Sequence, residues 1–170
     1  MNKIGVIGIG NPLRGDDGIG IVLLERLQSI CEKLPEYIEY IDGGTGGMNL
    51  LHVFPKFECI ILIDAVNFGG VPGEFKVFSL DEICSKKLNF GSSTHESDFL
   101  NIISISKKLH EIPKYFFIFA IQPKDVLFSQ CLSEELKQKL DYLVILLESE
   151  LLMICKKYFD DIETKNQIDR

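Results

Sequence analysis

The sequence predicts a three-layer α/β/α domain built on a twisted, mostly parallel sheet of five strands, and three observations lead to this fold class. Short apolar runs of the kind that form buried strands recur along the chain. Segments with apolar residues at helical spacing lie between them, and several of the runs end in turns that carry glycine and aspartate. Strands that alternate with helices form doubly wound sheets, which bind ligands beyond the carboxyl ends of their strands.

The five strands are expected at residues 3–9, 37–42, 59–65, 74–80 and 115–121. The first is a β-branched run that ends in glycines, and the second alternates between apolar and polar residues. The third is apolar throughout, as expected of a central parallel strand that is buried on both faces. The fourth follows a cluster of turn residues, and the fifth is rich in aromatic residues.

Helices are expected after the first loop and at residues 48–54, 96–110 and 133–159. Asp16 or Asp17 is suited to cap the first helix, and Pro55 is expected to end the second. The apolar face of the third is expected at Phe99, Ile102, Ile103 and Leu109. The last has a leucine stripe at helical spacing, formed by Leu136, Leu140, Leu143, Leu147 and Leu151.

The composition fits one acidic domain, expected at residues 1–159, with a polar tail at 160–170. The net charge of −7 argues against a nucleic-acid partner and against a polybasic membrane contact. The apolar stretches are shorter than the ~20 residues of a membrane span, and the N-terminal run is interpreted as a strand and not as a signal peptide. Five scattered cysteines without a CxxC spacing fit reduced thiols, so a cytoplasmic location is expected.

The first loop, GNPLRGDDGIG, has glycines typical of a phosphate-binding loop but the wrong charges. Gly8 and Gly10 match the first two glycines of the dinucleotide motif GxGxxG, whereas Leu13 occupies the third place. Asp16 and Asp17 would put carboxylates where a helix N-terminus otherwise attracts phosphate. The loop is therefore not expected to bind a dinucleotide.

Carboxylates at the strand ends favour a cation instead. Asp17 in the first loop and Asp64 at the end of the third strand are expected at one crevice, and His95, just before a helix, could reach it. Two carboxylates and one imidazole suit a borderline divalent ion such as nickel or zinc, and they leave positions open for a substrate group. Asp42 and Gln122 also fall at this edge of the sheet.

Several alternatives stay open at the level of the sequence. His95 could cap the helix that follows it, and Asp16 could take the place of Asp17 as the ligand. His52 is interpreted as a partly buried residue of the short helix, and His110 as a residue at a helix C-terminus, where the dipole favours a cation. Nucleophilic catalysis has little support, because the sequence contains no GxSxG motif.

In combination, the motifs resemble those of the hydrogenase maturation proteases. GIGNPLRGDDGIG, DGGTGG, LIDAVNFGGVPG, STH and FAIQP occur in that order, over roughly residues 4–125. The resemblance implies a phosphorylase/hydrolase-like α/β/α fold and an endopeptidase of the aspartic or metal-dependent type. Such enzymes remove a short C-terminal extension from the large-subunit precursor of nickel–iron hydrogenases after nickel has been inserted.

The resemblance also implies roles for individual residues. The metal-contacting acids and histidine of the family correspond to Asp17, Asp64 and His95, which would be catalytic and would recognise nickel carried by the substrate. Zinc or cadmium could replace that nickel in crystals. Asp16, Asp42 and Gln122 would support the cleft. The ion could position the precursor while a carboxylate activates water, or it could act as a Lewis acid. The alternative function is a non-catalytic maturation chaperone that recognises the same nickel site.

Overall fold

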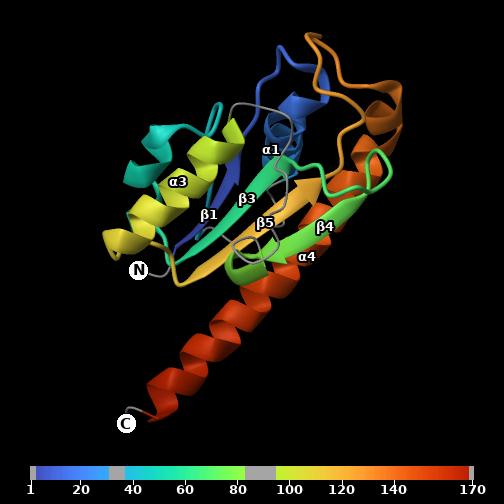
Figure 1. Cartoon of the computed structure of the whole chain (residues 1–170). Coiled ribbons are helices and arrows are strands. Elements are labelled where there is room, and N and C mark those ends of the chain that lie inside the picture. The colour runs from blue at the N-terminus through green and yellow to red at the C-terminus, as the bar shows by residue number, and fades with distance from the viewer. Residues whose placement is uncertain (1–2, 31–36, 83–94, 169–170) are drawn as a thin grey trace.

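The computed structural model of the chain describes residues 3–30, 37–82 and 95–168, and it describes only the backbone at 95–98 and 159–168. Within these residues, five strands form one sheet in the order β2-β1-β3-β5-β4 (Figure 1). The parallel strands are β1 (Ile4–Gly8), β2 (Ile38–Asp42), β3 (Cys59–Ala65) and β5 (Tyr115–Ile121), and β4 (Phe75–Ser79) pairs antiparallel with β5. The predicted fold class is confirmed.

The position of each strand in the sheet follows from its sequence. β1 is buried along its whole length, and β3 and β5 are buried almost throughout, because their apolar residues face helices on both sides of the sheet. β2 and β4 lie at the two edges, and both are only partly buried. β3 and β5 have the limits that the sequence predicts.

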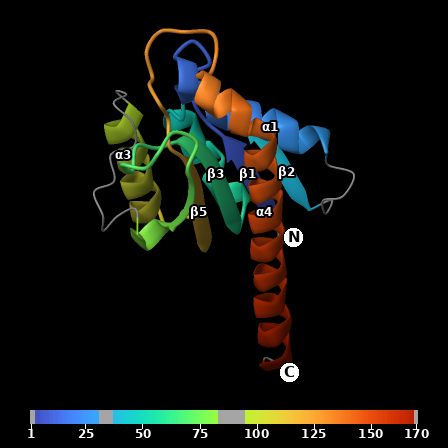
Figure 2. The same ribbon diagram turned by 90° about the vertical axis from the view of Figure 1, so that its right-hand side faces the viewer.

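Helices cover both faces of the sheet (Figure 2). α1 (Ile19–Ser29) and α4 (Glu134–Ile168) pack on one face, where the whole predicted leucine stripe of α4 is buried. α3 (His95–Lys108) and the 3₁₀ helices η3 (Met48–His52) and η4 (Phe54–Lys56) pack on the other face. No helix among the described residues combines the length and the apolar character needed to cross a bilayer.

Several local predictions are wrong. Pro55 does not end a helix, because it lies in the first turn of η4, where the missing N–H of proline costs no hydrogen bond. His52 is exposed instead of partly buried, and Leu109 is exposed beyond the end of α3. α4 continues past the predicted end at residue 159 to Ile168 and extends beyond the sheet (Figures 1 and 2).

The connections between the strands determine where the crevice lies. The chain passes from β1 through α1 to β2, and it returns through η3 and η4, on the other face, to β3 on the opposite side of β1. The winding therefore reverses between β1 and β3, and their carboxyl ends form the point at which doubly wound sheets bind ligands. α3 leads into β5, which is parallel to β3, so α3 begins at this same edge (Figure 1).

Candidate functional site

The glycines of the first loop allow its backbone to pack closely against neighbouring backbone segments. The N–H of Gly10, which has a φ of 142°, donates to the carbonyl oxygen of Gly44 at 2.8 Å, and the N–H of Ile9 donates to that of Ile63 at 3.0 Å. A Cβ at Gly20 would collide with the carbonyl oxygens of Ile9 and Ile63. Only glycine therefore lets the start of α1 lie against the ends of β1 and β3. This packing brings the two aspartates of the loop to the end of β3.

Asp16 fastens the first loop to the start of α4. Its Oδ1 accepts the backbone N–H of Ser133 at 2.7 Å, and its Oδ2 accepts those of Lys124 at 2.8 Å and Asp125 at 3.5 Å. The side chain is almost fully buried, so these donors replace the water that its charge has lost. In this structure Asp16 is a link between two loops.

The prediction that Asp16 or Asp17 caps the first helix is wrong. The two aspartates form part of a 3₁₀ turn, η1 (Gly15–Gly18), that precedes α1. The residue at the N-cap of α1 is Gly18, and no side chain donates or accepts a capping hydrogen bond there. The 3₁₀ turn moves both carboxylates away from the capping position, and it thereby makes them available for other contacts.

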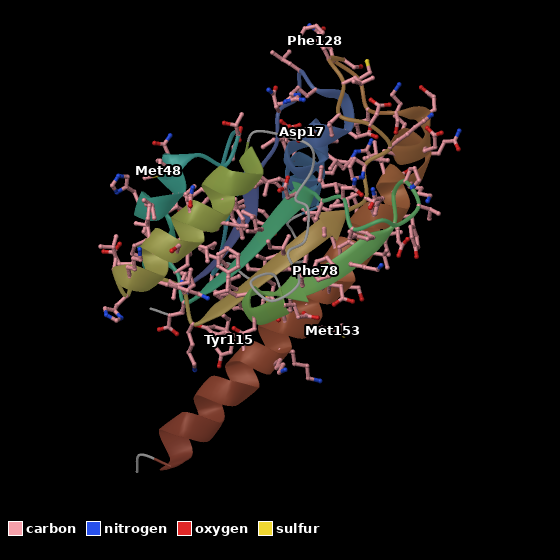
Figure 3. All side chains as sticks on the ribbon, viewed as in Figure 1. Asp17, Met48, Phe78, Tyr115, Phe128 and Met153 are labelled. Atoms are coloured by element: carbon pink, nitrogen blue, oxygen red, sulfur yellow. The ribbon has the colours of Figure 1, made fainter. Side chains whose placement is uncertain are left out.

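Asp17 and Asp64 come together at the point where the winding of the sheet reverses. Asp17 is buried, and its Oδ2 accepts the backbone N–H of Asn11 at 3.0 Å (Figure 3). Asp64 is the penultimate residue of β3, pairs with Ala120 of β5 and is partly buried. Burial raises the pKa of Asp64 well above its usual value, and the negative charge of Asp17 raises it further, while a backbone hydrogen bond from Ala65 lowers it.

This pair has a clear electrostatic character. Two carboxylates that share a poorly solvated space repel each other, and a proton or a cation between them relieves the repulsion. Ionised, they are oxygen ligands for a divalent ion. A carboxylate with a raised pKa is also a better base than an ordinary aspartate at neutral pH.

His95 cannot be joined to this pair from the described side chains. It is the first residue of α3, so its backbone lies towards the edge of the sheet that carries Asp17 and Asp64, but its side chain lies outside the described residues. Among the side chains that are described, no group of three or more His, Cys, Asp or Glu could hold a metal ion. The triad of Asp17, Asp64 and His95 stays a prediction.

Gln122 organises the turn that follows Asp64. Its side chain is buried, and its Oε1 accepts the backbone N–H groups of Phe68 at 2.9 Å and Gly70 at 3.1 Å. Its Nε2 donates to Asn67 Oδ1 and to the carbonyl oxygen of Pro123, both at 3.1 Å. Both lone pairs of Oε1 and both N–H groups of Nε2 form hydrogen bonds within the protein, so Gln122 holds the turn that follows Asp64 in place.

Asp42 lies farther out on the same edge. It is exposed at the end of β2, and its Oδ1 accepts the backbone N–H of Gly44 at 2.8 Å, which closes the turn. With Asn49 and Val53 it lines a hollow of about 380 Å³. A second, mainly apolar groove of about 640 Å³ lies beside α4. It is at the other end of the strands, where β3 begins at Cys59 and β5 begins at Tyr115. None of the predicted site residues lines it.

The sequence reasoning missed the loop at residues 123–133, which lies against the first loop (Figure 2). The N–H of Gly15 donates to the carbonyl oxygen of Ser129 at 2.8 Å, and the N–H of Ser129 donates to that of Leu13 at 3.0 Å. Arg14 Nε donates to the carbonyl oxygen of Val126 at 3.2 Å. These contacts join segments more than a hundred residues apart, so no local pattern indicates them.

The comparisons with known proteins agree with one another. The family model described as hydrogenase maturation protease matches residues 21–150. The hydrogenase expression/formation protein HupD of Bradyrhizobium diazoefficiens is 32% identical over 129 residues, which are 74% of this chain and 65% of HupD. The chain thus spans slightly less than two thirds of that relative. The hydrogenase 2 maturation protease of Escherichia coli is 30% identical over 125 residues, which are 73% of this chain and 75% of that protein.

The solved structures agree as well. The hydrogenase maturating endopeptidase HybD from Escherichia coli superposes with a TM-score of 0.77 at 25% identity, over 89% of this chain and 93% of HybD. The family match covers most of the chain and includes Asp64 and Gln122. By sequence and by fold, the chain belongs to the hydrogenase maturation protease family.

Proposed function

We propose that this protein is an endopeptidase that removes the C-terminal extension from the large-subunit precursor of a nickel–iron hydrogenase. Membership of the family supports the class of reaction, and the names of its relatives in Escherichia coli refer to maturation of a hydrogenase. The observation that carries the proposal is the pair of carboxylates, Asp17 and Asp64, at the reversal point of the sheet.

In this proposal, Asp17, Asp64 and His95 recognise the nickel ion that the precursor carries. Burial raises the pKa of Asp64, and repulsion from Asp17 raises it further; a divalent cation would relieve that repulsion, so the pair has an electrostatic reason to bind one. The precursor would supply the remaining ligands, which makes cleavage depend on nickel insertion. The nickel would position the extension, and a carboxylate of the pair would activate the attacking water.

The test uses the purified full chain and two forms of the precursor, one loaded with nickel and one free of it. Intact-mass spectrometry should show loss of a C-terminal fragment from the nickel-loaded form alone. An unchanged precursor mass at an excess of the protein would contradict the proposal. Capture of the loaded precursor without a change in its mass would instead favour the chaperone function.

A further inference from the structure

The loop at residues 123–133, called here the tip loop, exposes large apolar side chains at the end of the molecule that carries Asp17 (Figure 3). Leu127 is 72% exposed and Phe128 is 83% exposed. Leu13, which is 49% exposed, lies on the adjoining first loop, where its carbonyl oxygen accepts the N–H of Ser129. Single exposed apolar residues are common, but a group of them on two joined loops indicates a surface that binds a partner.

Hydrogen bonds hold the tip loop in one shape. Asp125 Oδ1 accepts the N–H of Leu127 at 3.3 Å, and Ser129 Oγ both accepts the N–H of Cys131 at 3.2 Å and donates to its carbonyl oxygen at 3.0 Å. Arg14 and Asp16 bind the loop from outside. Phe128 is therefore presented by an ordered loop, and little conformational entropy would be lost when a partner covers it.

The same contacts connect the tip loop to the candidate site. Asp16 holds the two ends of the tip loop, at Lys124 and Ser133, and Asp17 is its neighbour in the chain. A molecule whose peptide lies at Asp17 and Asp64 would have its adjoining surface beside Leu13 and the tip loop. The apolar group thus lies on two loops that are joined, through Asp16, to the segment that carries Asp17.

The charges at the base of the tip loop indicate the chemistry of the partner. Lys124 Nζ lies 2.7 Å from Glu135 Oε1, and Lys137 Nζ lies 2.7 Å from Glu134 Oε1, so these lysines are neutralised by their own neighbours. The large side chains that the tip loop exposes most, those of Leu127 and Phe128, are apolar. An apolar protein surface fits this tip better than an anionic polymer does.

We propose that Leu13, Leu127 and Phe128 form the docking surface for the body of the protein substrate, and that they bind an apolar patch beside the extension to be removed. The inference rests on the proposed function for the identity of the partner. Aromatic side chains at the centre of an interface contribute a large share of binding energy. The tip loop would therefore set affinity for the precursor and would leave the chemical step at Asp17 and Asp64 unchanged.

The experiment compares two double variants of the full chain. Leu127→Ser with Phe128→Ser removes the two most exposed apolar side chains of the tip loop. Ile145→Ser with Tyr142→Ser removes another exposed apolar pair, on α4, at 63% and 59% exposure. We expect the tip variant to raise KM for the nickel-loaded precursor by about tenfold or more, with kcat within about twofold of the wild type. The α4 variant should match the wild type in both.

Binding of the loaded precursor, measured by calorimetry with each variant, separates the two proposals. If the wild type binds but does not cleave, the proposed function fails, and a tenfold weaker Kd for the tip variant still supports docking. An unchanged Kd and KM would overturn the inference, and so would a loss confined to kcat. Sedimentation that shows a wild-type dimer, which the tip variant abolishes, would also overturn it, because the patch would then join two copies of this chain.

Discussion

Asp17 and Asp64 interact electrostatically, although one lies in the loop after β1 and the other near the end of β3. The charge of Asp17 adds to the effect of burial and raises the pKa of the Asp64 carboxyl. The pair forms because α1 begins directly against the ends of both strands, which a glycine at position 20 allows. The relationship has consequences for activity and for stability.

Replacement of either carboxylate should abolish processing. Asp17→Asn and Asp64→Asn keep the size of the side chain but remove the charge that a cation or a water molecule requires. We expect the rate of precursor cleavage to fall by about a hundredfold or more in each variant. Initial rates from intact-mass spectra measure this, and circular dichroism verifies the fold. Full activity in both variants would show that the site lies elsewhere.

The stability of the protein should respond to pH through Asp64. Its pKa in the folded state is raised above the unfolded value of about 3.9, so the folded state binds the proton more tightly. The stability that protonated Asp64 contributes is fully present below the pKa of the unfolded state. It is lost as the pH rises through the pKa of the folded state. Asp64→Asn should therefore be more stable than the wild type at neutral pH, with a Tm about 2–4 °C higher for each kcal/mol gained.

Thermal unfolding between pH 4 and pH 8, in the presence of a chelator, provides the measurement. The difference in Tm between Asp64→Asn and the wild type should grow as the pH increases. Asp81→Asn changes an exposed aspartate and serves as the control. Parallel Tm curves for the wild type and Asp64→Asn would mean that the ionised Asp64 carboxyl does not destabilise the folded state.

Asp16 should matter for the fold more than for the chemistry. Asp16→Ala leaves three backbone N–H groups without their charged acceptor, so the free energy of unfolding should fall by roughly 2–4 kcal/mol. Urea titration measures the change. Asp125→Ala, which removes one local hydrogen bond to Leu127 and an exposed charge near Lys124, should cost less. Equal effects of the two substitutions would refute the role of Asp16 as a link between the loops.

The sequence predicts those parts of the fold that depend on local patterns. β3 and β5 are continuous apolar runs, and the leucine stripe of α4 has a clear helical period, so all three are identified correctly. The end of α4 is not predicted, because its last residues are polar and their composition suggests a tail. The turn at Pro55 is misread because the same residue can end one helix or begin the next.

The candidate site is predictable only in part. Asp17 and Asp64 follow from the topology, since Asp17 lies beyond the carboxyl end of β1 and Asp64 lies near the carboxyl end of the neighbouring β3. The sequence does not indicate which of Asp16 and Asp17 links the loops and which lies beside Asp64. That depends on the hydrogen bond from Ser133 to Asp16, and the two residues are 117 positions apart in the chain. The hydrogen bonds of Gln122 to Phe68 and Gly70 span more than fifty positions and are equally invisible to local patterns.

The cysteines should differ sharply in reactivity. Cys131 is exposed on the tip loop, whereas Cys59 and Cys155 are buried. Burial raises the pKa of Cys59 to about 12 and that of Cys155 to about 11, so both thiols stay protonated and unreactive at pH 8. Iodoacetamide should label Cys131 in the native protein, and peptide mass spectrometry should find Cys59 and Cys155 labelled only after denaturation. Rapid native labelling of Cys59 would contradict the described packing of β3.

The end of α3 offers a stabilising substitution. His110 has a φ of 59°, in the left-handed region that glycine adopts without strain. Its N–H donates to the carbonyl oxygen of Lys107 at 3.2 Å, and the N–H of Glu111 donates to that of Ser106 at 3.0 Å, which is the hydrogen-bond pattern of a glycine-ended helix. His110→Gly should therefore raise the free energy of unfolding by about 0.5–1 kcal/mol.

Urea titration of His110→Gly and His110→Ala distinguishes strain from charge at this position. Alanine keeps a Cβ and therefore keeps the backbone strain, so His110→Ala should be no more stable than the wild type. If an attraction between the imidazole and the helix dipole outweighed the strain, both variants would be less stable than the wild type. A gain in the glycine variant alone assigns the effect to backbone conformation.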